Sequence, residues 1–145
     1  MSAFPGDGYE PAYPEQGSGA TEDIKAMLTD FYRTSDQTEA DERWVSLFTR
    51  DAQVTIGGDE AVGEDEIRKM RLSMWEKTQG RKHNVAKVFP GRFADGGWEA
   101  MVLGEVRLTM EGTEVVVPWS GHAVLRRGDD GEWRFARYRV WLQWR

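Results

Sequence analysis

The chain of 145 residues contains no cysteine and only two histidines. The missing thiols exclude disulfides, thiolate metal sites and a cysteine nucleophile, and a zinc site would need carboxylates beside the imidazoles. Basic side chains are also scarce: 19 Lys and Arg stand against 25 Asp and Glu, a net charge of −6. A nucleic-acid surface needs clustered basic residues. We therefore expect no metal ion and no nucleic-acid partner.

Long hydrophobic runs are absent as well. No stretch approaches the ~18 apolar residues of a membrane span, and the N-terminus lacks the positive patch and apolar core of a signal peptide. These absences predict a cytoplasmic protein with no membrane partner. The chain is nevertheless 39% hydrophobic and 12% aromatic. Its length suits one domain with a substantial core.

The first twenty residues differ in composition from the rest. Residues 1–20 hold three of the five prolines and four glycines, with no helix or strand period. This composition predicts a disordered tail, followed by one domain over residues 21–145. The tail contains three aromatic residues that could fold over a pocket mouth or a partner: Phe4, Tyr9 and Tyr13.

The C-terminal third organises the chain as a sheet. Three consecutive strands are predicted over residues 98–110, 115–127 and 132–144, joined by two short glycine-containing turns. Five of the seven tryptophans lie here. In the last two strands, apolar residues occupy both odd and even positions, so both faces of the sheet are apolar. We therefore expect a homodimer packed through the sheets.

The upstream segments alternate between helical and extended patterns. A helical stripe begins after Thr21, and further helices are predicted over residues 39–48 and from Gly63 to Gly80. Strands are expected over residues 52–56 and 81–89, the second stopped by Pro90-Gly91. The predicted class is α+β, with three N-terminal helices packed on one face of a curved antiparallel sheet and a pocket between them.

At this point the chain resembles a known family. The carrying segments are the helix pair leading into Leu47-Phe48-Thr49-Arg50-Asp51-Ala52 and the strand Gly131-Glu132-Trp133-Arg134-Phe135-Ala136-Arg137. They are similar to the SnoaL-like branch of the NTF2-like superfamily, with its polyketide cyclases, ketosteroid isomerase and scytalone dehydratase. The resemblance covers about residues 21–145 and implies a cone-shaped fold with a mostly apolar cavity. The same fold also serves as a non-catalytic binding module.

The resemblance implies specific pocket residues. Asp36 after the first helix, His83 in the strand after the third helix and Ser120 in the penultimate strand match the dehydratases. Three positions depart from them. Two tyrosines of that family are replaced by Ser35 and Ile56, and its second histidine has no counterpart in the strand over residues 98–110.

The residues themselves also indicate acid–base chemistry. The Asp36 carboxylate could fix the tautomer of His83 and stabilise its charged form, giving an acid/base near neutrality. His122 shares the strand parity of Ser120, and Tyr138 on the neighbouring strand could lie on the same side. His122 is thus predicted as a second acid/base, and the set would suit proton abstraction beside a carbonyl.

Each candidate also has a structural explanation. Asp36 could simply cap the second helix, a role for which Asp41 competes. The two histidines could be hydrogen-bonded packing residues, Ser120 could fill space, and Tyr138 could be cavity wall.

The predicted function is a cofactor-independent lyase, isomerase or cyclase acting by enolisation or dehydration on a small hydrophobic, polyketide- or terpenoid-like substrate. The alternative is a non-catalytic small-molecule-binding or accessory protein, and a protein-interaction module is a third possibility. The predicted catalytic residues are His83, Asp36 and His122. The substrate-binding residues are expected to be Tyr32, Phe48, Ile56, Met70, Met74, Val85, Ser120, Val124, Tyr138 and Val140.

Overall fold

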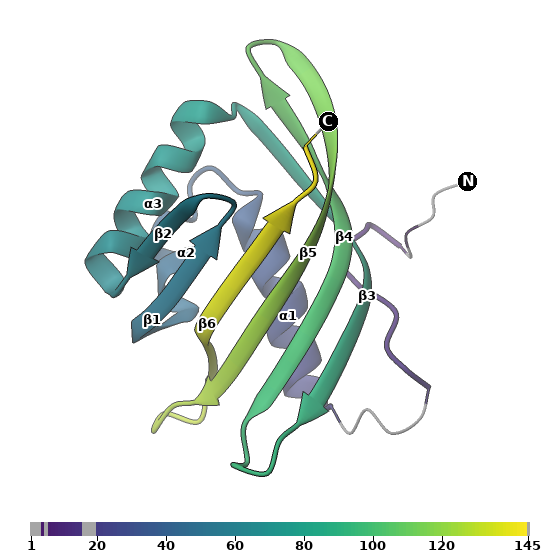
Figure 1. Cartoon of the computed structure of the whole chain (residues 1–145), viewed down its shortest axis with the longest axis vertical. Helices are drawn as coiled ribbons and strands as arrows, with labels where there is room; N and C mark the ends of the chain where they lie inside the picture. The colour runs from purple at the N-terminus through teal and green to yellow at the C-terminus, as the bar shows by residue number, and fades with distance from the viewer. Residues whose placement is uncertain (1–3, 5, 16–19, 145) are drawn as a thin grey trace.

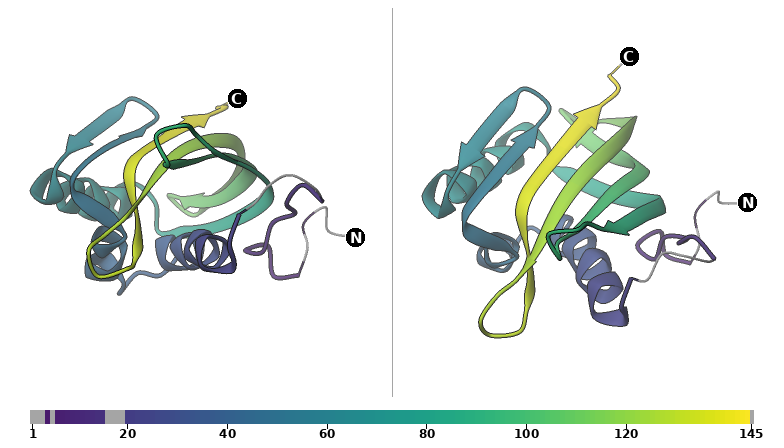
Figure 2. Two further views of the ribbon diagram at one scale, coloured as in Figure 1. Left: turned by 90° about the horizontal axis from the view of Figure 1, so that it is seen from below. Right: turned by 60° about the horizontal axis from the view of Figure 1, so that its bottom comes forward.

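The computed structural model describes residues 4, 6–15 and 20–144. In this part of the chain the elements follow in the order α1 (Glu22–Ser35), α2 (Asp41–Ser46), β1 (Phe48–Ile56), β2 (Asp59–Val62), α3 (Glu64–Lys77), β3 (Gly80–Arg92), β4 (Trp98–Met110), β5 (Thr113–Arg127) and β6 (Trp133–Leu142). The class is α+β, as predicted: one curved six-stranded sheet wraps around α1, with α2 and α3 beside it (Figures 1 and 2). None of these helices is long and apolar enough to cross a membrane.

The sheet has the strand order β2-β1-β6-β5-β4-β3. Every neighbouring pair is antiparallel except β1 with β6, which run parallel. The prediction of an antiparallel sheet is therefore wrong at this pair. The prediction of three N-terminal helices is also wrong, because α3 follows the first two strands.

The structure contains one strand, β2, that the sequence pattern does not indicate. Gly57 and Gly58 follow β1 and form the turn of a hairpin that joins β1 to β2. Gly57 has a φ of 60°, a left-handed conformation that glycine adopts without strain. Strand β3 also runs beyond its predicted end, through Pro90. Proline is tolerated there because β3 is the last strand in the sheet order.

An aromatic cluster holds α1 and α2 against the sheet. The ring of Phe31 lies 4.5 Å from that of Phe135, 5.1 Å from that of Tyr138 and 5.9 Å from that of Trp44, measured between centroids. All four side chains are buried. Burial of such large rings contributes the largest share of apolar area in a core of this size.

The C-terminal end of α1 is held by a buried arginine from α3. Arg71 is fully buried and donates hydrogen bonds to the backbone oxygens of Ser35 at 2.8 Å and Gln37 at 2.7 Å. Its Nε lies 2.8 Å from Asp41 Oδ1. The last carbonyls of a helix have no partner within the helix. Arg71 therefore satisfies them and fixes the position at which the chain leaves α1.

The two faces of the sheet differ in what covers them. In β5, Val117, Trp119 and Ala123 are buried against the helices, whereas the alternating residues lie on the outer face. That outer face carries exposed apolar side chains from three strands: Met101, Leu103, Val116 and Trp141.

Part of the N-terminal segment lies along β3. Ala12 pairs with Lys87 as an isolated bridge, and the backbone N–H of Val85 donates to the oxygen of Gly8 at 2.7 Å. In the structure, residues 6–15 of this segment thus lie beside β3. Residues 1–3, 5 and 16–19 of that tail lie outside the described residues.

Replacement of Arg71 by methionine should lower the free energy of unfolding by about 3 kcal/mol, because buried carbonyls and Asp41 lose their partner. Urea denaturation of the purified variant measures this loss. Lys69→Met, on an exposed position of the same helix, is the matched control. Equal stability of the two variants would contradict the role given to Arg71.

Candidate active site

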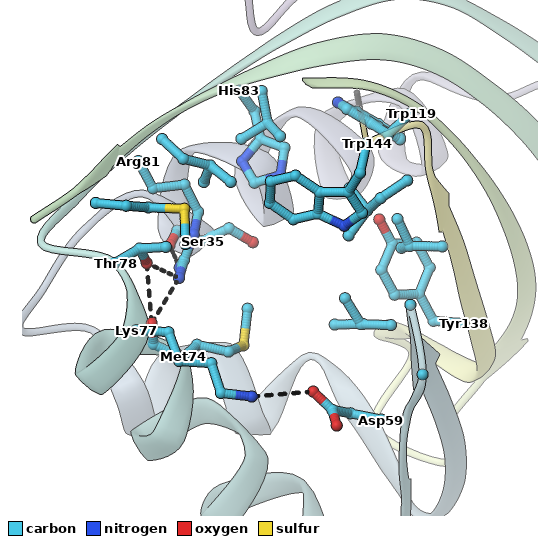
Figure 3. A pocket seen from close by; sticks show the side chains of 18 of the residues that line it. Ser35, Asp59, Met74, Lys77, Thr78, Arg81, His83, Trp119, Tyr138 and Trp144 are labelled. Atoms are coloured by element: carbon cyan, nitrogen blue, oxygen red, sulfur yellow. Dashed lines mark hydrogen bonds and ion pairs between the residues drawn. The ribbon is translucent and has the colours of Figure 1, made fainter. Parts of the chain in front are cut away.

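A cavity of about 260 Å³ lies between the concave face of the sheet and the ends of α1 and α3. Its wall is largely apolar, with residues from all six strands and from α1, α2 and α3 (Figure 3). The polar side chains that line it are Ser35, Asp59, Lys77, Thr78, Arg81, His83 and Tyr138. Such a composition suits a small, mainly hydrophobic ligand with a few polar groups.

The predicted pair of Asp36 and His83 is formed at the edge of this cavity. His83 Nδ1 lies 2.7 Å from Asp36 Oδ1, and the backbone N–H of His83 donates to Oδ2 at 2.7 Å. An ionised carboxylate only accepts hydrogen bonds, so Nδ1 carries a proton, and in the neutral imidazole Nε2 then carries the free electron pair. The imidazole projects into the cavity (Figure 3), which leaves Nε2 as its available base.

A third donor completes the surroundings of the carboxylate. The hydroxyl of Tyr9 donates to Asp36 Oδ2 at 2.6 Å. Burial by itself would raise the pKa of Asp36, but the hydrogen bonds and positive charge of His83, together with the Tyr9 bond, outweigh burial and lower that pKa. Asp36 is therefore ionised at neutral pH, as the pair requires.

Aromatic rings surround His83. The ring centroid of Tyr32 lies 5.4 Å from that of His83, and the centroid of Trp119 lies 5.7 Å away. The hydroxyls of Tyr32 and Tyr138 are 2.9 Å apart and buried. Burial raises the pKa of both phenols, so both stay protonated. Either hydroxyl can donate to the other, and when Tyr32 donates, the Tyr138 proton is available on the cavity wall.

The cavity also contains a cation that the sequence analysis did not identify. Arg81 donates to the backbone oxygen of Ser35 at 3.0 Å and to Thr78 Oγ1 at 3.1 Å, and its guanidinium lies 4.4 Å from the Trp75 ring centre. Burial, with a smaller contribution from the neighbouring Arg71, lowers the pKa of Arg81 to about 10. The side chain therefore still carries its charge at neutral pH. Across the cavity from His83, Lys77 and Asp59 pair at 3.5 Å (Figure 3).

The prediction that His122 is a second acid/base of the pocket is wrong. In the β5–β6 register, Tyr138 lies opposite Ala123, while His122 lies opposite Arg139. Residues directly opposite each other share a face, so His122 projects from the outer face. There its Nε2 lies 2.7 Å from Glu99 Oε1. Ser120 and His122 do share one face of β5, as predicted, but that face is the outer one and not the one that lines the cavity.

The predicted substrate-binding residues divide into three groups. Ile56, Met74, Tyr138 and Val140 line the cavity. A second group is buried in the core and absent from the cavity wall: Tyr32, Phe48, Met70 and Val85. Ser120 and Val124 lie on the outer face of β5, because they alternate with the buried residues of that strand. Alternation alone distinguishes the two faces, but it does not say which face the helices cover.

Some lining residues were missed although a signal existed. Trp119 shares its parity with Val117 and Ala123, the apolar set of β5, and it lines the cavity. Arg81 had no such signal, since a charged residue in a strand is usually solvated. Among the residues that the structure describes, no cluster of three or more His, Asp or Glu side chains could hold a metal ion.

Comparison with known proteins identifies the fold. No protein-family model and no curated protein sequence matches the chain. Solved structures do match. A candidate scytalone dehydratase from Novosphingobium aromaticivorans superposes with a TM-score of 0.74 at 18% identity, covering 84% of this chain and 83% of the other. A ketosteroid isomerase-like protein from Erwinia carotovora atroseptica gives 0.62 at 22% identity, covering 84% and 92%.

Nuclear transport factor 2 from Cryptosporidium parvum gives 0.71 at 17% identity, covering 82% of this chain and 90% of that protein. These likenesses confirm the fold that the resemblance implies, and they show the fold alone. The neighbours include proteins named for catalysis and a protein named for transport, so the fold by itself does not choose between these functions.

Asp36→Asn should destabilise the protein in a pH-dependent way. The folded pKa of Asp36 is lower than its unfolded value of about 3.9, so its contribution to stability is present above that pH and is lost as the pH falls through the folded pKa. At pH 7 the variant should lose about 1–3 kcal/mol of unfolding free energy. The difference in unfolding free energy between the variant and wild type should shrink as the pH falls below about 4.

Urea denaturation between pH 7 and pH 3 measures this difference. Asp59→Asn, whose carboxylate is mostly exposed, is the control and should change stability little at any pH. A difference for Asp36→Asn that stays constant down to pH 3 would show that its carboxylate is not stabilised in the folded state.

Proposed function

We propose that the protein is a cofactor-independent lyase, isomerase or cyclase that moves a proton on a small hydrophobic molecule. The observation that carries this proposal is the orientation of His83: Nδ1 is bound to the Asp36 carboxylate, and the ring enters an apolar cavity. A base of this kind suits abstraction of a proton beside a carbonyl group. The expected substrate class is polyketide- or terpenoid-like, with an enolisable carbonyl.

The proposed first step is enolisation. Nε2 of His83 takes the proton from the carbon beside the carbonyl. The C–H electrons form a carbon–carbon double bond, and the carbonyl π electrons move to oxygen. The imidazolium that results is stabilised by Asp36, 2.7 Å from its other nitrogen. Tyr138 is assigned as the hydrogen-bond donor to the enolate oxygen, since burial keeps its phenol protonated.

The second step determines the reaction type. Return of the proton to a different carbon is an isomerisation. Its transfer to a leaving hydroxyl, with cleavage of the C–O bond, releases water and is a dehydration. Attack of the enolate carbon on a second carbonyl of the same molecule is a cyclisation. The neighbours named as a candidate scytalone dehydratase and as ketosteroid isomerase-like support this range of chemistry.

A non-catalytic binding function is the second candidate, and one observation favours it. His122 lies outside the cavity, so His83 is the only imidazole available to a ligand there, since the chain has just two histidines. A site with one base and a largely apolar wall can also bind a hydrophobic molecule without converting it. The two candidates differ in whether a bound ketone exchanges its protons.

Exchange of the α-protons of 2-tetralone in D2O, followed by NMR, tests the proposal. The wild-type protein should accelerate exchange over buffer, and His83→Gln should reduce the acceleration at least about 100-fold, because it removes the base. His122→Gln is the matched control and should leave exchange unchanged. Binding of 2-tetralone, seen by saturation-transfer NMR, without any exchange would instead support the non-catalytic function.

We also propose a homodimer that packs through the outer face of the sheet. The exposed apolar side chains of Met101, Leu103, Val116 and Trp141 support it. Light scattering coupled to gel filtration should give twice the mass of the chain for wild type and for Leu72→Glu, an exposed position on α3. Trp141→Glu should give the mass of one chain. A wild-type protein of single-chain mass at micromolar concentration would exclude this dimer.

A further inference from the structure

We infer that Tyr9, in the N-terminal segment of residues 6–15, is a positioning residue that fixes the Asp36 carboxylate behind His83. This inference rests on the proposed function, because it assigns Tyr9 to the same acid–base pair. The N-terminal segment would then contribute to the site, although it is not part of any of the helices and strands described above. Tyr9 acts through Asp36 and does not line the cavity.

Backbone hydrogen bonds hold the segment on the same strand that carries His83. The N–H of Val85 donates to the Gly8 oxygen at 2.7 Å, two residues beyond His83. Ala12 then exchanges bonds with β3: its N–H donates to Ala86 and its oxygen accepts from Val88, both at 3.0 Å. Strand β3 is last in the sheet order, so its outer peptide groups are otherwise unpaired by the sheet. The segment lies on that side of β3 in both figures of the whole chain (Figures 1 and 2).

The approach to β3 requires glycine at position 8. Gly8 has a φ of +90°, in the region that favours glycine, and a Cβ atom there would collide with the Asn84 side chain. This close contact lets the next residue, Tyr9, turn toward the end of α1. The backbone conformation of Gly8 therefore helps to place the Tyr9 hydroxyl beside Asp36.

Charged neighbours fix the ring of Tyr9. Lys82 Nζ lies 3.8 Å from the ring centre, and the Arg33 guanidinium lies 5.6 Å from it. Asp7 joins this arrangement, since its carboxylate pairs with Arg33 at 2.8 Å and its backbone oxygen accepts from Lys82 at 2.9 Å. The hydroxyl is thereby held at Asp36 Oδ2, 2.6 Å away. Burial and the bond to Asp36 raise the pKa of Tyr9, so it is a donor at any physiological pH.

The two oxygens of Asp36 have separate partners. Oδ1 accepts from the His83 ring, while Oδ2 accepts from the His83 backbone and from Tyr9. Three donors on one carboxylate fix its plane, and the ring of His83 follows that plane. Loss of the phenol would leave Oδ2 with one donor, so the carboxylate would bind a proton more tightly and hold the imidazole less firmly.

Other charges lie around Asp36 and Tyr9, and their effects on the protonation of Asp36 must be distinguished from the effect of the Tyr9 hydroxyl. Those that interact with Asp36 itself are Arg71 on α3 and Arg81, Lys82 and His83 on β3. Asp7 and Arg33 act on Tyr9, and Asp41 acts on Arg71 and Arg81. Replacement of Tyr9 by phenylalanine keeps all of these charges and the ring. The difference between the two proteins therefore reports on the hydroxyl.

The test is a carboxyl 13C NMR titration of Asp36 in the full-length wild type, Tyr9→Phe and Tyr13→Phe. Tyr9→Phe should make Asp36 bind protons about ten-fold more tightly, as expected for the loss of one hydrogen bond to a charged group. Tyr13→Phe is the matched control: its hydroxyl is buried in the same segment without a hydrogen-bond partner in the described structure. Its Asp36 titration should equal that of wild type.

A second measurement gives the consequence for turnover. In the 2-tetralone exchange assay, Tyr9→Phe should lower kcat about ten-fold with KM unchanged, because the substrate contacts of the cavity are kept while the base is less well positioned. Amide shifts of Val85 and Val88 show whether the segment stays docked. Gly8→Val, which removes the segment from β3, should reproduce the change in the Asp36 titration.

The outcomes separate this inference from the proposed function. An Asp36 titration that is the same in wild type and Tyr9→Phe, with the segment docked, overturns the role of Tyr9. The 15N shifts of the His83 ring report its tautomer independently. If Asp36→Asn leaves that tautomer unchanged, the acid–base pair itself is absent, and the proposed function fails whatever Tyr9 does.

Discussion

The site depends on how two guanidinium groups hold the end of α1. Arg71 and Arg81 both donate to the backbone oxygen of Ser35, from α3 and from β3. The residue that follows is Asp36, so these bonds set the place from which its carboxylate reaches β3. Carbonyls at a helix end attract cations, and buried guanidinium groups have several donors in fixed directions. The same contacts thus stabilise the fold and position the base.

The electrostatic balance around Asp36 follows from this arrangement. Burial alone would raise the pKa of Asp36, but three hydrogen bonds and the charge that His83 carries when it is protonated lower that pKa. The cost of burying Arg71 is offset in a similar way by Asp41 and by helix carbonyls. Each buried charge has partners from at least two elements, so loss of one partner would disturb packing and protonation together.

The fold class could be predicted from local signals in the sequence, whereas the acid–base pair could be predicted only through the family resemblance. Alternation and turn residues located the meander of β4, β5 and β6, and the resemblance brought Asp36 and His83 together. The orientation of His122 could not be derived from parity, because parity relates residues within a strand and the β5–β6 register decides which residues meet across it. Arg81 and Tyr9 were missed for a related reason: their roles arise from contacts between distant segments, which no periodicity encodes.

The parallel pairing of β1 with β6 has a consequence for how the molecule assembles. β6 is the last strand in the chain but lies inside the sheet, between β1 and β5. β6 is thus the strand that joins the β1–β2 hairpin to the β3–β5 meander, and without it β1 and β5 would each lack a neighbour on that side. Closing such a long-range ladder is intrinsically slow and exposes apolar strands meanwhile. The sheet therefore cannot become continuous until β6 has been synthesised, because β6 is the strand that pairs with both β1 and β5.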